Sequence, residues 1–501
     1  MRMNPAPANA STGEPGFARA ITLTDAVMLV AGSMIGSGIF IVSADIARAV
    51  GSPFWLLVVW GLTGVITLLG ALAYGELAAM FPRAGGQYIF LREAMGPLTG
   101  FLYGWTLFVV IQTGTIAAVA VAFARFLGVL WPEITPDRFA WFPSLDVTTA
   151  GGVIEFGLSP QRVIALISVW VLTWVNLRGV KEGKALQTTL TVVKTGALIG
   201  LIILGVTIGR NATALTANFG PGQFMGTTSF SSAFVLAFGA ALVGSLFSSD
   251  AWNNVTFAAA EVHNPKRNLP LALLIGTGLV TVLYLAANLA YLMMLPLQGS
   301  PDGTTTLARG IQFAMEDRVG TAAAEILFGA AGGTIMAIAI LIATFGCNNG
   351  LILAGARVYY AMARDRLFFR AAGTLNERQV PAVGLTLQAV WVSLLCLTGT
   401  YGQLLDYVIF ANLVFYVLTT SGLFVLRRTR PEMERPYRAI GYPVLPALYI
   451  ALAASVAVIL LVADKTRAQA LSGLVLVLIG VPIYYLWRRL APPGAAQSTA
   501  E

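Results

Sequence analysis

Long apolar stretches are the feature that most restricts what this chain of 501 residues can fold into. A helix that spans a bilayer needs about 20 mostly apolar residues, and twelve successive windows of the chain meet that requirement. They cover approximately residues 21 to 50, 54 to 80, 97 to 128, 160 to 178, 185 to 208, 231 to 260, 269 to 297, 325 to 363, 382 to 399, 404 to 426, 443 to 463 and 469 to 488. We therefore predict an all-α integral membrane protein with twelve transmembrane helices. The eighth window is too long for one span, so part of it should lie in a loop or project beyond the bilayer.

Composition narrows the possible functions. Only 11% of the residues are charged, against roughly 25% in a soluble domain. The net charge of +8 does not indicate nucleic-acid binding, because basic residues of membrane proteins mark cytoplasmic loops. Two cysteines inside apolar runs and a single histidine predict no disulfide framework, no metal site and no cofactor. A membrane enzyme would need a nucleophile and base, or a metal cluster, and the sequence offers neither.

The basic residues are unevenly divided between the connections. If the N-terminus lies inside, most Lys and Arg fall in cytoplasmic segments, which predicts a multi-pass protein of the cell (inner) membrane with both termini in the cytoplasm. Residues 1 to 20 lack the basic start of a signal peptide and are expected to form a cytoplasmic tail. The lysines and arginines of the outer connections are only Arg138, Arg210, Arg309, Arg318, Lys465 and Arg467.

Two spans are interrupted by glycine and short polar residues, at 32 to 38 in the first span and at 248 to 254 in the sixth. Unwound backbone at membrane depth persists only where it is buried in protein or lines a cavity. Paired interruptions five spans apart are typical of transporters built from two inverted repeats. The predicted units are a first repeat at 21 to 208, a second repeat at 231 to 426, helices eleven and twelve at 443 to 488, and a cytoplasmic tail at 489 to 501.

The first interruption predicts an anion site. The outer half-helix would begin with free N–H groups at Gly36, Ser37 and Gly38, which suit a carboxylate. With Met34 and Ile35 at the end of the inner half-helix, these five residues are candidate substrate-binding residues. The alternative is that the glycines only allow helices to pack closely.

The second interruption adds groups that accept hydrogen bonds. Carbonyls freed around Phe247 and Asp250 could bind an ammonium, so the two breaks together suit a zwitterion, and an amino acid is the simplest one. The carboxylate of Asp250 has two interpretations that the sequence leaves open. It could select ligands, or it could cap the outgoing half-helix.

Lys194 lies inside the fifth span, where a charge costs about 3 kcal/mol on insertion scales. We expect it to be paired or uncharged and to have a working role, although it could instead snorkel to the cytoplasmic face. Four other charged residues lie near or within spans, and each has a structural use in capping or in pairing near an interface: Asp45, Glu76, Arg357 and Asp406.

The chain resembles the amino acid/polyamine/organocation superfamily, and within it the L-type amino-acid transporters. Two stretches carry most of the resemblance, Met34-Ile35-Gly36-Ser37-Gly38-Ile39-Phe40 and the turn Asn264-Pro265-Lys266-Arg267-Asn268-Leu269-Pro270. Supporting stretches are Tyr74-Gly75-Glu76-Leu77, Pro82-Arg83-Ala84-Gly85-Gly86, Trp252-Asn253, Thr344-Phe345-Gly346, Gly355-Ala356-Arg357, Leu426-Arg427 and Pro431-Glu432-Met433-Glu434-Arg435-Pro436.

The resemblance implies a LeuT-type five-plus-five inverted repeat with broken helices 1 and 6 and alternating access. The substrate carboxylate would meet the N–H groups of Ser37 and Gly38, and carbonyls of Met34, Phe247 and Asp250 would hold the amine. Phe247 would act as a gate, and Asn253 and Asn412 would border the side-chain pocket. Lys194 matches a lysine that stands in place of a sodium site, so it is a candidate coupling residue. Animal members bond to a heavy chain through a cysteine after the third span, but residues 129 to 159 contain none, so no disulfide-linked heavy chain is expected.

The residues before Trp252 differ from the commonest pattern of the L-type transporters. Many L-type members have Gly-Gly before the tryptophan, whereas this chain has Asp250-Ala251, which is similar to the Asp-Gly of exchangers for cystine and dibasic amino acids. We therefore expect a sodium-independent secondary transporter of amino acids, an antiporter or a proton-coupled carrier, with a range that includes cationic amino acids. The alternatives are a transporter of polyamines or other amines and, from another class, a non-transporting amino-acid sensor.

Overall fold

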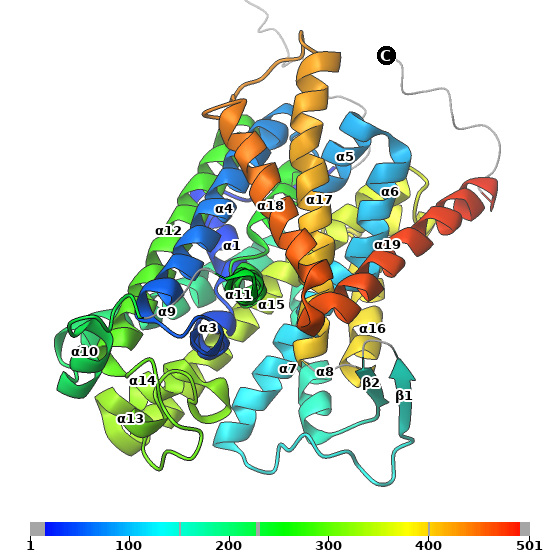
Figure 1. Cartoon of the computed structure of the whole chain (residues 1–501). Helices are drawn as coiled ribbons and strands as arrows, with labels where there is room; N and C mark the ends of the chain where they lie inside the picture. The colour runs from blue at the N-terminus through cyan, green and yellow to red at the C-terminus, as the bar shows by residue number, and fades with distance from the viewer. Residues whose placement is uncertain (1–15, 150–151, 227–230, 399–400, 491–501) are drawn as a thin grey trace, which may run out of the picture.

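The computed structural model describes residues 16–149, 152–226, 231–398 and 401–490, and these are mostly helical (Figure 1). The long helices are α4 (Pro53–Met80), α7 (Gln112–Leu130), α8 (Pro160–Leu177), α9 (Val180–Thr207), α11 (Ser232–Ser248), α12 (Pro265–Met294), α15 (Gly332–Arg364), α16 (Ala382–Thr398), α17 (Tyr401–Thr429), α18 (Val444–Val462) and α19 (Asp464–Leu490).

The shorter α-helices are α1 (Leu23–Met34), α2 (Gly38–Ile41), α3 (Ser43–Val50), α5 (Gln87–Met95), α6 (Pro97–Thr106), α10 (Ala212–Phe219), α13 (Thr306–Arg309) and α14 (Val319–Phe328). A π-helical segment, η1 (Leu107–Ile111), joins α6 to α7, and the 3-10 segments are η2 (Trp252–Thr256), η3 (Ala259–Glu261), η4 (Met315–Asp317), η5 (Gly329–Ala331) and η6 (Arg370–Gly373).

Ten helices among the described residues are long and apolar enough to cross a membrane. The first and ninth predicted windows contain shorter apolar helices, Leu23–Met34 and Ala382–Leu397. The first is short because α1 ends at the predicted interruption. The prediction for the eighth window is confirmed, since its first residues belong to α14 and the chain turns at Gly329 (φ 58°) before α15 begins.

The all-α prediction needs one correction. The connection between α7 and α8 contains two antiparallel strands, β1 (Leu145–Thr149) and β2 (Gly152–Phe156), with Leu145 opposite Phe156. Such a short pair lies in a polar connection, where the apolar windows used for the prediction carry no signal.

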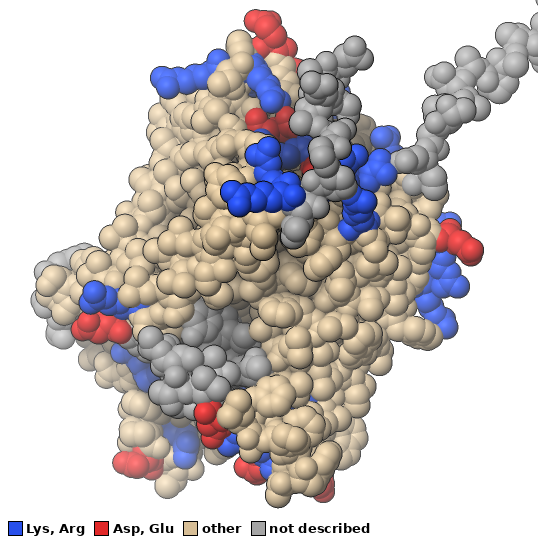
Figure 2. Space-filling model, turned by 90° about the vertical axis from the view of Figure 1, so that its right-hand side faces the viewer, with Lys and Arg blue, Asp and Glu red and all other residues tan. Residues whose placement is uncertain are grey.

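The molecule has two distinct ends. One contains β1, β2, α10, α13 and α14 and is called the hairpin end; the other contains α5 and the end of α17 and is called the α5 end (Figure 1). Between them lies a broad band of surface with few charged side chains, while lysine and arginine gather toward the α5 end (Figure 2). A band of helical surface with few charges, between two ends that carry charges, is the arrangement that a bilayer requires.

Helix α1 lies in the interior and packs against α9, α12 and α15. Its start is fixed by a capping box, in which the Thr22 hydroxyl accepts the Asp25 N–H and the Asp25 carboxylate accepts the Thr22 N–H. A Cβ atom at Gly32 would lie 2.2 Å from both Gln187 Nε2 and Thr191 Oγ1, so the glycine permits the close approach of α1 to α9.

Candidate functional site

The predicted interruption of the first span is present. Helix α1 ends at Met34, Ile35 has non-helical dihedral angles (φ −74°, ψ 95°), and α2 starts at Gly38. Gly36 and Ser37 therefore form the bend between the two half-helices, and all five residues are buried. Gly38 faces the end of α11 so closely that a Cβ atom there would lie 2.1 Å from Ser248 Oγ. Only glycine allows this approach without displacement of the neighbouring helix.

The interruption of the sixth span is also present. Helix α11 ends at Ser248, and Ala251 adopts left-handed dihedral angles (φ 64°) before the 3-10 segment η2. The N–H of Asp250 donates to the Phe247 carbonyl at 3.1 Å, across the end of the helix. The two breaks thus lie side by side, with Gly38 against Ser248.

Tyr284 of α12 connects the two breaks. Its hydroxyl lies 3.1 Å from the Met34 carbonyl and 3.0 Å from the Ser248 carbonyl. A phenolic hydroxyl has one proton and can donate to only one of these oxygens at a time. Tyr284 cannot be singled out from the sequence, because a single tyrosine in an apolar helix carries no signal that separates it from ordinary membrane packing.

Lys194 is 2% exposed and points at the break in α1. Its ammonium donates to the carbonyls of Gly32 at 2.5 Å and Ile35 at 2.7 Å, and to Ala343 of α15 at 3.3 Å. The snorkelling alternative is therefore wrong. The carbonyls that α1 leaves unpaired where it ends are satisfied by a side chain from α9, which joins three helices at one point.

Asp250 is buried, and its carboxylate binds two side chains of α17. Asn412 Nδ2 donates to Oδ2 at 2.6 Å and the Tyr416 hydroxyl donates to Oδ1 at 2.5 Å. The N-cap of η2 is Ala251, with no side-chain cap, so the structure does not support the capping interpretation. A cavity of about 20 Å³ adjoins the carboxylate, between Ser249, Trp252 and Tyr449. Such a space holds about one water molecule.

Asn412 and Asn253, the two asparagines expected at the side-chain pocket, lie in different places. Asn412 lines the small cavity beside Asp250. Asn253 does not, because its amide donates to Gln87 Oε1 of α5 at 2.8 Å. Gln87 in turn donates to Thr419 of α17 at 3.0 Å, so Asn253 belongs to a buried hydrogen-bonded chain toward the α5 end. Neither Gln87 nor Tyr416 was found from the sequence, since each acts through a partner more than 100 residues away.

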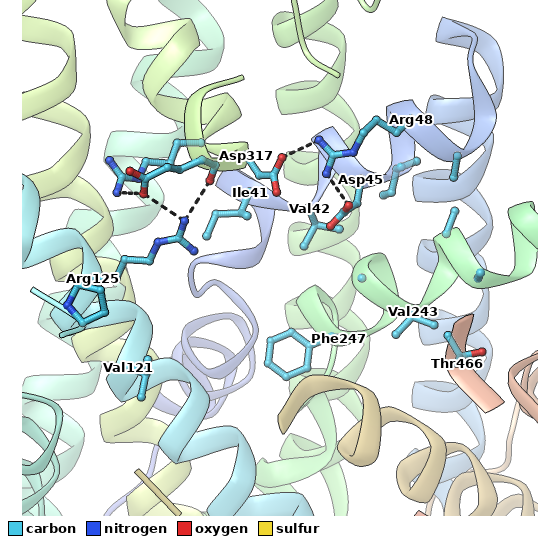
Figure 3. A pocket seen from close by; sticks show the side chains of 18 of the residues that line it. Ile41, Val42, Asp45, Arg48, Val121, Arg125, Val243, Phe247, Asp317 and Thr466 are labelled. Carbon is cyan, nitrogen blue, oxygen red and sulfur yellow. Dashed lines mark hydrogen bonds and ion pairs between the residues drawn. The ribbon is translucent and has the colours of Figure 1, made fainter. Parts of the chain in front are cut away.

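A cavity of about 1590 Å³ opens at the hairpin end. Phe247 points into it from α11, opposite residues of α2, α3 and α7 (Figure 3). Ion pairs stand around its mouth: Arg48 with Asp45 and with Asp317, and Arg125 with Glu316. Phe247 is 8% exposed and lies one residue before α11 ends at the break of the sixth span.

At the α5 end, by contrast, contacts between the segments around α1, η3, α9 and α15 hold these elements together. The segment before α1 pairs with the segment after η3, through an isolated parallel bridge between Ile21 and Val262. Beneath it, Arg357 of α15 donates to both carboxylate oxygens of Glu261, at 2.8 and 3.2 Å, and both side chains are 1% exposed. Lys184 adds bonds from α9 to the Ala20 carbonyl and to Asp25.

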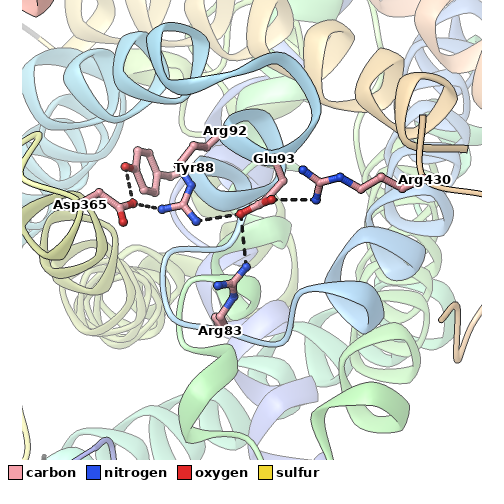
Figure 4. A network of polar contacts seen from close by, with 6 residues as sticks. All are labelled: Arg83, Tyr88, Arg92, Glu93, Asp365 and Arg430. Carbon is pink, nitrogen blue, oxygen red and sulfur yellow. Dashed lines mark hydrogen bonds and ion pairs between the residues drawn. The ribbon is translucent and has the colours of Figure 1, made fainter. Parts of the chain in front are cut away.

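Further ion pairs fix the loops of the α5 end. Arg427 donates to both carboxylate oxygens of the buried Glu76, which also accepts the Ala439 N–H at 2.6 Å. Around α5, Glu93 accepts from Arg83, Arg92 and Arg430, while Asp365 accepts from Arg92 and Tyr88 (Figure 4). The pairing roles expected for Glu76, Asp45 and Arg357 are therefore confirmed, whereas the side chain of Asp406 lies outside the described residues.

Comparison with known proteins gives the family. Residues 21–482 match the family model described as amino acid permease. The chain belongs to this family of amino acid permeases. It is 29% identical over 477 residues to the serine/threonine exchanger SteT of Bacillus subtilis (strain 168), which covers 95% of this chain and 98% of that protein.

Animal relatives are similar over nearly the same length. The permease is 30% identical over 492 residues to the large neutral amino acids transporter small subunit 2 of Rattus norvegicus (96% of this chain, 83% of that protein). It is 27% identical over 470 residues to the b(0,+)-type amino acid transporter 1 of Mus musculus (93% of this chain, 87% of that protein). The resemblance to L-type transporters is thus confirmed, and the chain is a multi-pass membrane transporter, not an enzyme.

Proposed function

We propose that the permease exchanges amino acids across the cell membrane without sodium, and that the substrate binds between the breaks of α1 and α11. The observation that carries the proposal is the contact of Gly38 with Ser248, which brings the N–H groups of one half-helix beside the carbonyls of another. A zwitterion presents a carboxylate to the N–H groups and an ammonium to the carbonyls of such a pair of ends.

The substrate carboxylate binds the N–H groups at Gly36, Ser37 and Gly38, and the amine binds carbonyls of Met34, Phe247 and Asp250. Tyr284 already contacts the Met34 carbonyl, so substrate binding replaces or shares this hydrogen bond. In this conformation the substrate arrives through the cavity at the hairpin end and passes Phe247. Closure of that end and opening of the α5 end would complete alternating access.

Lys194 takes the place of a cation at the end of the inner half-helix. Two carbonyls of α1 accept its ammonium, as they would coordinate a bound sodium ion. A fixed positive charge there removes the need for sodium. Exchange, for which the B. subtilis relative is named, is preferred to proton coupling.

The side-chain pocket favours substrates with a polar or cationic terminus. Asp250, Asn412 and Tyr416 face the small cavity beside the α11 break, and a cation could replace the hydrogen bonds that the carboxylate now accepts. The b(0,+)-type relative supports the inclusion of cationic amino acids. A transporter of polyamines would use Asp250 but leave the N–H groups of the α1 break without a ligand.

The architecture proposed for this function has twelve transmembrane helices in a LeuT-type arrangement. The first repeat covers 21 to 208, the second covers 231 to 426, and residues 443 to 488 add two helices. The α5 end, where basic residues gather, faces the cytoplasm with both termini. The connection at 129 to 159 contains no cysteine, so no heavy chain is disulfide-linked there.

Flux into proteoliposomes tests the proposal. Vesicles preloaded with serine, leucine, arginine or putrescine receive each labelled compound outside, with and without sodium and pH gradients. We expect internal amino acid to stimulate uptake and sodium to have no effect. A sodium requirement, uptake of putrescine alone, or ligand binding without flux would contradict the proposal, and the last would indicate a sensor.

A matched pair of variants links this flux to the breaks. Gly38→Ala places a methyl group against Ser248 and should abolish both uptake and ligand-induced thermal stabilisation. Gly196→Ala, on α9, meets open space and should leave both unchanged.

A further inference from the structure

One corner of the α5 end brings together two segments that are far apart in the sequence. Helix α15 ends at Arg364, the chain continues through Asp365 to η6, and this segment meets the last turn of α19. The contact is between the rings of Phe369 and Trp487, whose centroids lie 5.2 Å apart. Tryptophan is a residue that concentrates where a membrane meets water.

The corner contains five arginines, and three of them line a concave surface. Arg364, Arg366 and Arg370 line a cavity of about 650 Å³ with Ala363 and Gly373. Arg488 and Arg489 follow Trp487 directly. All five arginine side chains are exposed.

Four of the five arginines at this corner are not neutralised by any acidic side chain that the structure describes. Among the described residues, no aspartate or glutamate forms an ion pair with Arg366, Arg370, Arg488 or Arg489. The adjacent acid, Asp365, accepts from Arg92 and Tyr88 and is directed at α5 (Figure 4). Elsewhere at this end, arginines such as Arg427 and Arg430 do have carboxylate partners.

We propose that this corner binds the headgroup of an anionic phospholipid. Arg366 and Arg370 donate to its phosphate, and Arg488 and Arg489 add positive charge from α19. A guanidinium binds phosphate oxygens through two parallel hydrogen bonds, which makes arginine well suited to this ligand. Basic pockets at the cytoplasmic ends of transmembrane helices are typical sites for such headgroups.

The surface next to the corner favours a lipid over a soluble phosphate. Helix α19 presents exposed apolar side chains along its length, and these lead toward Arg488: Leu471, Val475, Leu478, Ile479 and Leu486. Acyl chains can lie on this face while the headgroup remains at the arginines. A soluble phosphate would use only the charges.

Native mass spectrometry of the full-length protein in detergent tests the proposal. Dioleoylphosphatidylglycerol and dioleoylphosphatidylcholine are titrated separately, and inorganic phosphate is added in excess as a competitor. The variant Arg366→Gln/Arg370→Gln removes two arginines from the corner. The control, Arg267→Gln/Arg428→Gln, removes two exposed arginines elsewhere at the same end.

We expect phosphatidylglycerol to bind more tightly than phosphatidylcholine and to resist inorganic phosphate. Each arginine near an anionic surface contributes about a factor of five, so the corner variant should bind roughly 30-fold more weakly. The control should bind as the parent does. If the corner variant fails to fold, Arg488→Gln/Arg489→Gln should show the same loss. Equal binding of the two lipids, equal losses in corner and control variants, or displacement by phosphate would overturn the proposal.

Discussion

The two ends of the permease use ion pairs in different surroundings. At the α5 end, Glu261 and Arg357 are each 1% exposed, and they join the segment after α11 to α15. At the hairpin end, the side chains of Arg48 and Asp317 are 31% and 38% exposed, and they join α3 to η4 beside an open cavity. A buried pair that loses one partner leaves a costly charge behind, whereas exposed pairs are screened and contribute little.

This difference indicates how the two ends can move. The pairs at the hairpin end can separate or form at small cost, so they suit a mouth that opens and closes around a substrate. At the α5 end, opening must either keep Glu261 and Arg357 together as one unit or admit water between them. The breaks that follow α1 and α11 lie between these two ends. A small movement of a half-helix at either break can therefore be transmitted to both ends of the molecule.

The largest expected effect comes from the buried pair. Arg357→Met leaves the Glu261 carboxylate buried without a partner and should lower the free energy of unfolding by about 3–5 kcal/mol. Unfolding by SDS in mixed micelles measures this. The double variant Glu261→Gln/Arg357→Met removes the buried charge and should recover most of the loss. A single variant as stable as the parent would show that the two ends do not differ in this way.

The second largest effect concerns the connection between the ends. Lys194→Ala removes hydrogen bonds from a charged donor to α1 and α15, each contributing about 1.5–3 kcal/mol. We expect exchange in proteoliposomes to fall by more than about tenfold, with ligand-induced thermal stabilisation largely retained. Lys181→Ala, an exposed lysine on the same helix, is the control and should exchange normally. Loss of binding together with exchange would instead place Lys194 in the substrate site.

A smaller effect should appear on acidification of the α5 end. Burial alone would raise the pKa of Glu93, but hydrogen bonds from Arg92 and Arg430 outweigh it and lower the pKa below 4.5. The stabilising contribution is therefore fully present above pH 4.5 and is lost as the pH falls through the lower folded-state value. Thermal unfolding of the parent and of Glu93→Gln should differ by about 1 kcal/mol at pH 7. The two should converge in acid, and a constant difference would contradict the assignment.

The smallest effect is expected at the mouth of the cavity. Arg48→Gln breaks two exposed pairs, with Asp45 and Asp317, and should change the free energy of unfolding by no more than about 1 kcal/mol. SDS unfolding of this variant beside Arg357→Met compares the two ends directly. A loss at Arg48 as large as the loss at Arg357 would remove the distinction between them.

Much of the site could be predicted from the sequence because its signals are local. Glycines and serines inside an apolar span predicted both breaks, and the position of Lys194 inside a span predicted a buried role. Tyr284, Tyr416 and Gln87 could not be found, because their roles depend on partners brought close only by the fold. The pairing of Glu261 with Arg357 was hidden for the same reason.

Cysteine labelling tests the central claim most directly, that a substrate at the two breaks is reached from the hairpin end past Phe247. Val243 lies one helical turn before Phe247 and lines the cavity, whereas Asp464 lies exposed at its mouth. The native Cys347 and Cys396 are buried, so background labelling should be low. We predict that a polar maleimide alkylates Val243→Cys, and that the rate of alkylation falls severalfold when the best-exchanged amino acid is added. The rate for Asp464→Cys should not change. A Val243→Cys protein that reacts equally fast with and without the amino acid would contradict the account.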